Sequence, residues 1–227
     1  DPTPTFDLTY GDKLTAATVL TNADFSFTDG DGNPITGVPE NVGSYKVSLN
    51  ASGQAKVQAA NGNYTLVADD FTAGKFTITA KSTTPNDATT EVTADSQTIT
   101  FGDTPADFTA TFGDKLNKVT LTNADFVFTQ GTTTENGVPT DAGSYEISLT
   151  GDAQTRIKAA NPNYKFSDTD FKTGTFLINP KTTTDGDVTT QVTPNDQTIT
   201  FGDTPDAFNA TFGDKLNKVT LTNEDFT

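Results

Sequence analysis

Acidic side chains are the groups in this sequence most able to do chemistry. The chain carries 30 Asp and Glu against 14 Lys and Arg, and it contains no His, Cys, Met or Trp. Thiol nucleophiles, His-based triads, disulfides and Cys-ligated metals are therefore excluded. Paired carboxylates could still cleave a glycosidic bond. However, 30 acids place some pair at a suitable distance by chance, and the internal repeats described below duplicate them. We therefore predict no catalytic and no cofactor-binding residue.

A short acidic loop suggests calcium binding at first sight. Asp29, Asp31 and Asn33 alternate in the sequence DGDGN, and Glu40 stands where the twelfth ligand of an EF-hand would be. Pro34 occupies the sixth position, where that loop requires Gly for its sharp turn. The corresponding segment 130–137 reads QGTTTENG. We therefore interpret the loop as a plain turn and predict no metal site.

Aromatic side chains could form a platform for sugars. Four of them stand at the alternate strand positions that we expect to face the core, which favours core packing over sugar binding: Tyr45, Tyr145, Phe25 and Phe126. Tyr64 and Tyr164 follow an Asn-X-Asn turn, and we expect each to anchor that turn with its hydroxyl bonded to the backbone. A ligand-binding site, if there is one, stays unknown from the sequence.

A Lys–Asn crosslink would suit a chain without cysteine. Such a bond needs a buried Lys, an Asn and a catalytic acid together. Asn179 is the candidate amide, but Thr79 stands at the matching position of the preceding repeat. We therefore do not predict this bond.

The elements that would hold these residues are mainly strands. Thr makes up 47 of the 227 residues, and Thr and Phe favour pleated sheets. Apolar residues alternate with polar ones in 44–49 and 145–149, which is the period of a strand. The Ala-rich segments 52–61 and 152–161 depart from this pattern, begin with Ser52 and Asp152 as expected N-caps, and end at Asn-Gly or Asn-Pro. They predict short helices with Val57 and Ile157 facing the sheet.

An internal repeat of about 100 residues organises the chain. Residues 97–126 and 197–226 are identical at 26 of 30 positions, and weaker copies of the same pattern start at residue 8. This regularity favours folded domains over disorder, although the hydrophobic fraction is only 33%. Polar segments between the copies predict linkers at 82–88 and 182–187. The expected domains are a first module (1–81) without its opening strands, a second module (89–181) and a half module (188–227).

Several short motifs carry a family resemblance. They are the aromatic-Gly-Asp element at 9–12 and 100–103, a Gly-Ser-Tyr strand after a Val-Pro loop, AANPNY at 159–164 and GTFLINP at 174–180. Together they resemble the YGX-type MBG repeats, also called mucin-binding-type repeats, of wall-anchored surface proteins in Gram-positive bacteria. The resemblance implies an extracellular adhesin or stalk made of compact β domains, and it transfers no catalytic residue. The fold class expected is mainly β, as tandem modules that are β-grasp-like or β-sandwich, each with one short helix.

The resulting functional hypothesis is a non-enzymatic repeat region of a bacterial cell-surface adhesin. It would act as a stalk or spacer and bind host glycans, mucin or wall polysaccharide weakly. The alternative is a set of accessory carbohydrate-binding repeats of a secreted glycan-processing enzyme. A net charge of −16 opposes nucleic-acid binding, and no apolar run approaches the roughly 18 residues of a membrane span.

The two ends of the sequence suggest self-association. The half module is small for an independent core. Its apolar residues need a partner: Val192, Ile199, Phe201, Phe208, Phe212, Leu216, Val219, Leu221 and Phe226. We expect segment 189–202 of one chain to complete the first module of another, head to tail. The alternative is that the half module packs on the second module or on a neighbouring molecule in a crystal, without exchange of a strand.

Overall fold

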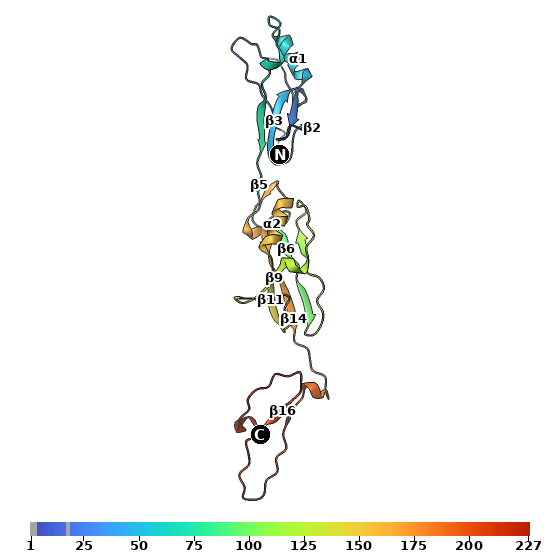
Figure 1. The fold of residues 1–227 in the computed structure, drawn as a ribbon, viewed down its shortest axis with the longest axis vertical. Helices are drawn as coiled ribbons and strands as arrows, with labels where there is room; N and C mark the ends of the chain where they lie inside the picture. Colours follow the sequence, from blue (N-terminus) through green and yellow to red (C-terminus); the bar gives the residue numbers. More distant parts are fainter. Residues whose placement is uncertain (1–3, 17–18) are drawn as a thin grey trace.

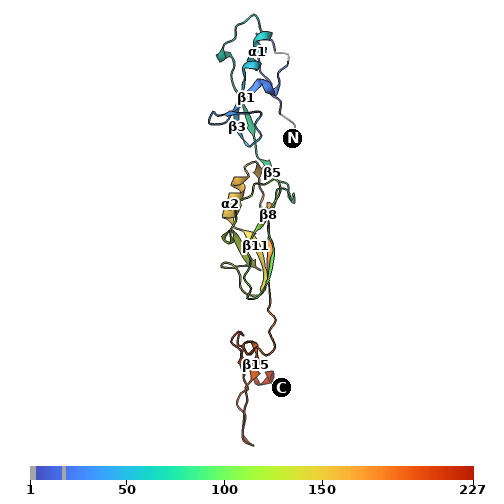
Figure 2. The ribbon, with the colours of Figure 1, turned by 90° about the vertical axis from the view of Figure 1, so that its right-hand side faces the viewer.

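The computed structural model describes residues 4–16 and 19–227. Figure 1 shows three bodies in a row, each formed by a continuous stretch of the chain, and Figure 2 shows the same row after a quarter turn. The bodies correspond to the first module, the second module and the half module. We keep these names, while the domain boundaries themselves remain a prediction.

The first module contains a four-stranded antiparallel sheet in the order β2-β1-β3-β4. One helix lies between β3 and β4 in the chain, and β4 forms an edge of the sheet. The elements are η1 (Asn22–Asp24), β1 (Phe25–Thr28), β2 (Pro34–Ile35), β3 (Gly43–Leu49), α1 (Ala51–Ala60), η2 (Ala68–Asp70) and β4 (Gly74–Ile78).

The second module repeats this arrangement and adds strands. Its main sheet has the order β10-β9-β11-β14-β7, in which β7 lies parallel to β14. A smaller sheet has the order β13-β6-β8. The elements are β6 (Val92–Ala94), β7 (Gln97–Thr100), β8 (Ala110–Phe112), η3 (Asn123–Asp125), β9 (Phe126–Gln130), β10 (Thr133–Thr134), β11 (Gly143–Leu149), α2 (Gly151–Ala160), β12 (Tyr164–Lys165), η4 (Asp168–Asp170), β13 (Phe171–Lys172) and β14 (Gly174–Asn179).

The half module has little regular structure and a largely exposed surface. A two-stranded antiparallel pair is its main element. The elements are η5 (Val188–Thr190), β15 (Val192–Pro194), β16 (Ala210–Phe212) and η6 (Asn223–Asp225). In both views it lies beyond the second module as a body of its own (Figures 1 and 2).

The core of the second module confirms the strand phase expected from the sequence. Tyr145, Ile147 and Leu149 of β11 are all buried, and so are Phe176 and Ile178 of β14. Phe108 is the centre of the aromatic packing, with ring centroids 4.7 Å from Phe128 and 5.2 Å from Phe176. In the first module Phe6 takes the same place, 5.1 Å from both Phe27 and Phe76.

Both helices are confirmed, and both bury the predicted residue: Val57 is 3% exposed and Ile157 is 0% exposed. The predicted N-caps, however, are wrong. Asn50 accepts a bond from the Gly53 amide in α1, and Thr150 accepts one from the Ala153 amide in α2. Each helix therefore starts directly after a strand, and the capping residue is the single residue that joins the strand to the helix.

The fold class is confirmed as mainly β, with tandem modules that each carry one short helix. The sequence left open whether each module is β-grasp-like or a β-sandwich, and the second module combines features of both. A five-stranded sheet and a three-stranded sheet share one core in the second module, and α2 adds Ala153 and Ile157 to it.

Candidate functional site at the junction between modules

The segment that leaves the first module pairs with the second module. Residues Lys81–Ser82 form β5, which lies parallel to β12 (Tyr164–Lys165). The Lys81 amide donates to the Asn163 carbonyl at 3.0 Å, and the Thr83 amide donates to the Lys165 carbonyl at 3.1 Å. A polar segment expected to be a connector is thus hydrogen-bonded to the module that follows it.

The Asn163 side chain closes the junction from the other side. Its Oδ1 accepts from the Val42 amide at 2.8 Å, and its Nδ2 donates to Oδ1 of Asn41 at 2.9 Å. Asn163 therefore uses its carbonyl and its side chain to hold two separate parts of the first module, the β5 segment and the loop before β3. Two such contacts on different segments restrict rotation about the connection in a way that one strand pair does not.

Asp170 supports the same connection. Its carboxylate is buried, and Oδ2 accepts from the Thr83 hydroxyl at 2.6 Å and from the Ser167 amide at 2.6 Å. Oδ1 is buried and has no hydrogen-bond partner among the residues that the structure describes. The Thr83 hydroxyl consequently ties the connecting segment to a buried group of η4.

The second connection has no such contacts among the described residues. Residues 181–186 are exposed, and their equivalents of Asn163 and Asp170 are not part of 188–227. Asp187 caps η5 by accepting from the amide and hydroxyl of Thr189, as Asp87 does with Thr89 in the first connection. The Asp cap is therefore common to both connections.

The turn that presents Asn163 is itself held by Asn161. Asn161 is 3% exposed. Its Oδ1 accepts from the Asn117 amide at 2.6 Å, while Nδ2 donates to the carbonyls of Asn117 (3.0 Å) and Ile157 (2.9 Å). Asn61 makes the matching set of bonds with Thr15 and Val57 in the first module. This amide therefore fixes the end of each helix and the turn beyond it.

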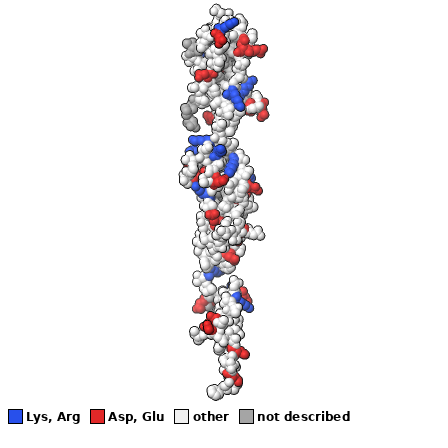
Figure 3. All heavy atoms as spheres, turned by 90° about the vertical axis from the view of Figure 1, so that its left-hand side faces the viewer, with Lys and Arg blue, Asp and Glu red and all other residues white. Residues whose placement is uncertain are grey.

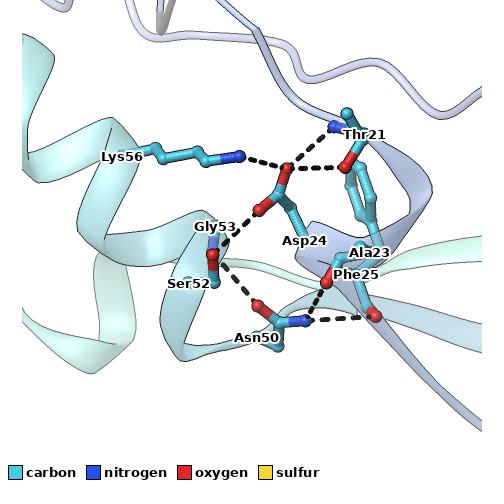
Figure 4. A network of polar contacts seen from close by, with 8 residues as sticks. All are labelled: Thr21, Ala23, Asp24, Phe25, Asn50, Ser52, Gly53 and Lys56. Atoms are coloured by element: carbon cyan, nitrogen blue, oxygen red, sulfur yellow. Dashed lines mark hydrogen bonds and ion pairs between the residues drawn. The ribbon is translucent and has the colours of Figure 1, made fainter.

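A second polar network joins the start of each helix to η1 or η3. In Figure 4, Asp24 receives hydrogen bonds from Lys56, Ser52 and Thr21, and Asn50 bonds to the carbonyls of Ala23 and Phe25. The hydrogen bond from Lys56, followed by that from the Thr21 amide, holds the pKa of Asp24 far below its usual range. This network is structural, because the carboxylate has no open side toward a ligand.

Asp125 is the counterpart of Asp24 in the second module. Arg156 forms an ion pair with it at 2.9 Å. The Arg156 hydrogen bond, followed by that from the Thr122 amide, lowers the pKa of Asp125. The same fold therefore uses Lys in one module and Arg in the other at this point.

The acidic DGDGN loop is a hairpin turn between β1 and β2. The Asp29 carboxylate accepts from the amides of Asp31 and Asn33 and from the Asn33 side chain, at 2.8–3.0 Å. These bonds, the Asn33 side chain first, lower the pKa of Asp29. Glu40 is not among the described residues that bond to the Asp29 carboxylate. In the part of the chain that the structure describes, no group of three or more acidic side chains could hold a metal ion.

The aromatic candidates divide into two sets. The structure buries Tyr45, Tyr145, Phe25 and Phe126 in the two cores. The expectation for Tyr64 and Tyr164 is wrong, because neither hydroxyl bonds to the backbone among the described residues. The anchoring hydroxyls belong to Tyr45 and Tyr145, which donate to the carbonyls of Asn41 (2.7 Å) and Asp141 (2.9 Å).

The candidate crosslink residue Asn179 is exposed at the end of β14, and none of the described Lys residues is buried. The structure does bring a Lys, an Asn and a Glu together elsewhere. Lys172 Nζ lies 3.1 Å from Asn86 Oδ1 and 3.3 Å from Glu91 Oε1. Asn86 is exposed and Lys172 is one-third exposed, so water reaches the amine and the amide. We interpret the three as an ion pair with a hydrogen bond.

Charged groups are spread along the surface. Figure 3 shows acidic and basic side chains interspersed on one face, with basic ones gathered at the end of the second module nearest the first. The stretch from α2 to β13 contains Arg156, Lys158, Lys165 and Lys172. Among the described residues, no helix combines the length and the apolar character that crossing a membrane requires.

Sequence reasoning missed the junction residues Asn41 and Asn163. The signal that could have found them is the motif AANPNY, since its second Asn recurs as Asn63 in the first module without an obvious role in the turn. The bonds themselves link residues 121 or 122 positions apart, and no local pattern reports such pairs.

The family model described as the MBG domain matches the chain twice, over residues 1–80 and 81–180. The chain is also similar to a solved structure of a cell surface adhesin from Lactobacillus reuteri, with 29% identity and a TM-score of 0.32 over 41% of this chain and 100% of that one. No curated protein sequence matches it. The two family matches meet directly before Lys81, where β5 begins.

Proposed function

This chain belongs to the MBG domain family, and from that premise we propose that it is a non-enzymatic repeat region of a bacterial cell-surface adhesin, acting as a stalk. We propose that the chain is extracellular and lies on the cell wall of a Gram-positive bacterium. Its task is to hold a binding region at a distance from the surface. Repeated copies suit this task because the length of a stalk grows with their number.

The observation that carries the proposal is the clamped junction. A stalk keeps its reach only when successive domains cannot fold back on one another, whereas free motion is the usual behaviour of domains joined by a polar linker. Asn163 and β5 together supply three kinds of contact at this connection: a strand pair, a side-chain amide pair and a bond to a backbone amide. The extended row of bodies in Figures 1 and 2 agrees with such a joint.

The experiment measures the distance between the modules in solution. The chain has no native Cys, so spin labels can be placed at two exposed helix positions through Ala55→Cys and Ala159→Cys. Electron–electron double resonance then gives the distribution of distances. We expect a narrow distribution for the otherwise unchanged chain and a width increased about two-fold by Asn163→Ala, because the released linker allows domain motion.

The matched control is Asn63→Ala. Asn63 occupies the same place in the first module's turn, is exposed, and makes no side-chain hydrogen bond among the described residues. Its replacement should leave the distribution narrow. Broad distributions in all three chains would contradict the stalk, and equally narrow ones would contradict the role of Asn163 in the clamp.

Weak binding of host glycans, mucin or wall polysaccharide is the second part of the proposal. Many weak copies give useful avidity without a strong individual site. A glycan array probed with the chain as monomer and as a multivalent conjugate tests this part. We expect signal only from the conjugate, and the absence of signal from both would leave a stalk without ligand binding.

A further inference from the structure

The outer face of the first module's sheet carries positive charge in an acidic chain. Alternate residues of β1, β3 and β4 face the core, and the residues between them face away from it. Two neighbouring rows of this outer face consist of Thr28, Lys46 and Lys75, and of Ser44 and Thr77. Neither row contains an acid, although the net charge of the chain is −16.

The two lysines are opposite each other in the antiparallel pair of β3 and β4. Cβ atoms in such a pair are about 4.5–5.5 Å apart, and like charges at this distance destabilise a sheet. Both side chains are exposed. Among the described residues, the ammonium groups of Lys46 and Lys75 form neither an ion pair nor a hydrogen bond. An anion bound between the two lysines would remove their repulsion.

A shallow depression of about 320 Å³ lies at this pair. Its lining includes both lysines, the hydroxyl residues Thr28 and Ser44, and the turn between β1 and β2 with Asp29. The two carboxylate oxygens of Asp29 accept hydrogen bonds from groups within that turn, and Asp29 forms no ion pair with either lysine. The depression is therefore open to a ligand that brings its own negative charge.

The second module has the same depression with a different charge. There it measures about 360 Å³, and Ser144, Glu146 and Thr175 are part of its lining. Glu146 and Thr175 are paired in the same register as Lys46 and Lys75. Because both modules form the depression, it is a feature of the fold. The lysine pair is specific to the first module.

We propose that the depression of the first module binds a sulfate group carried by a host glycan. The ammonium groups of Lys46 and Lys75 donate hydrogen bonds to the sulfate oxygens. The hydroxyls of Thr28 and Ser44 exchange hydrogen bonds with hydroxyls of the sugar. This inference rests on the glycan-binding part of the proposed function and names the chemical class of the ligand.

The charges of the chain and of the site favour isolated sulfate groups over other anions. A net charge of −16 repels a dense polyanion such as a nucleic acid or an anionic membrane surface. A sugar chain with separate sulfate groups brings only a few charges to the lysines. A planar carboxylate is matched best by the fork of Arg, whereas Lys is a compact point charge. The single Arg of this chain, Arg156, belongs to the second module.

The test is an NMR titration of the 227-residue chain with a monosulfated N-acetyllactosamine. We expect saturable shifts of the backbone amides of Ser44, Lys46 and Lys75, and no such shifts with the unsulfated disaccharide. Sodium sulfate should bind more weakly because it lacks the sugar. A sialylated disaccharide should also bind more weakly because its charge is a carboxylate. Added salt should weaken binding of the sulfated disaccharide, since exposed charges are screened.

Variants of the two lysines separate the site from the general charge of the chain. Lys46→Gln and Lys75→Gln should each weaken binding of the sulfated disaccharide about two- to five-fold, and the double variant should abolish the shifts. The matched control, Lys118→Gln, removes the same charge from an exposed lysine of the second module and should leave binding unchanged. Thermal melts should show the first module folded in every variant, because loss of either lysine relieves a like-charge contact.

The depression of the second module offers the converse experiment. Glu146→Lys combined with Thr175→Lys recreates the lysine pair there, in the same register. This double variant should add a second set of shifts, at β11 and β14, when the sulfated disaccharide is titrated.

Four outcomes overturn the proposal. They are unshifted first-module amides, equal binding of the sulfated and unsulfated disaccharides, equal binding of the sialylated one, and equal losses in Lys118→Gln and Lys46→Gln. A chain that binds unsulfated sugars on the glycan array, with no effect of Lys46→Gln, would keep the proposed glycan binding and lose only this site. An array without signal for any sugar would contradict both.

Discussion

At the scale of single residues, buried carboxylates and aromatic rings carry most of the specificity of the fold. Asp125 combines low exposure with an Arg partner and a backbone amide, and Phe176 is fully enclosed by rings and aliphatic groups. The sequence predicts the enclosed rings well, because alternation places them on the inner face. It does not predict that Asp125 is buried, since the residues that stabilise its charge lie on a different element.

Acid should weaken both modules through Asp24 and Asp125. Their pKa values are lowered in the folded state relative to about 3.9 in an unfolded chain. The stability they contribute is therefore complete above about pH 4 and is lost as the pH falls through the folded pKa. Thermal melts from neutral pH downward should show a level region and then a decline. In the Asp125→Asn chain, the melting temperature of the second module should be lower at neutral pH and should fall less as the pH decreases. An equal fall of the melting temperature in both chains would contradict this role of Asp125.

Removal of an enclosed ring should be costly. Phe176→Ala, or Tyr145→Ala, should lower the free energy of unfolding by about 3–5 kcal/mol, as for other buried aromatic residues. Asp185→Ala in the exposed second connection should stay within about 0.5 kcal/mol. Denaturant titration measures both. An unchanged midpoint for Phe176→Ala would mean that this face is not the core.

At the scale of elements, each helix is held by a polar residue at its start and by an Asn at its end. The sequence predicts the end of the helix better than its start. The Ala-rich composition and the Asn that follows it predict the helices and their ends. The true caps, Asn50 and Thr150, come directly after the predicted strands, so the choice of Ser52 and Asp152 places each cap two residues too late. The strand β5 is harder still to predict, since the strand with which it pairs, β12, lies more than 80 residues away.

Asn161 should be sensitive to loss of its two donated bonds. Asn161→Asp keeps the shape but places a carboxylate against the carbonyls of Asn117 and Ile157. A buried polar group without its partner costs about 1–3 kcal/mol, more when charged. Chemical denaturation of the second module should report a loss at or above that range. Asn63→Asp, in the exposed part of the matching turn, should change stability little.

At the scale of the whole molecule, the three bodies differ in how completely their cores are closed. The second module has the full set of strands, the first has an open groove, and the half module exposes most of its apolar residues. The repeat length alone predicts the number and order of the bodies. It does not predict the clamp at one connection, because that depends on pairs of residues from different repeats.

Calorimetry should therefore resolve two unfolding transitions. The first module should melt at the lower temperature, because its ring Phe76 and its cavity are less enclosed than their counterparts. Tyr45→Ala should lower only that transition, and Tyr145→Ala only the higher one. A single transition shifted equally by both variants would contradict separate modules.

Limited proteolysis should cut the chain first within 181–208, where the backbone is exposed and makes few hydrogen bonds.

The parallel pairing of β7 with β14 has a mechanical consequence. The chain enters the second module's main sheet through β7 and leaves it through β14, and the two strands run in the same direction along four residue pairs. A pull on the two ends of the molecule therefore drags these strands past each other lengthwise. All the bonds of the ladder then bear the load together and must rupture at once, in contrast to a hairpin that opens one bond at a time. Under flow, the second module resists extension at the ladder between β7 and β14.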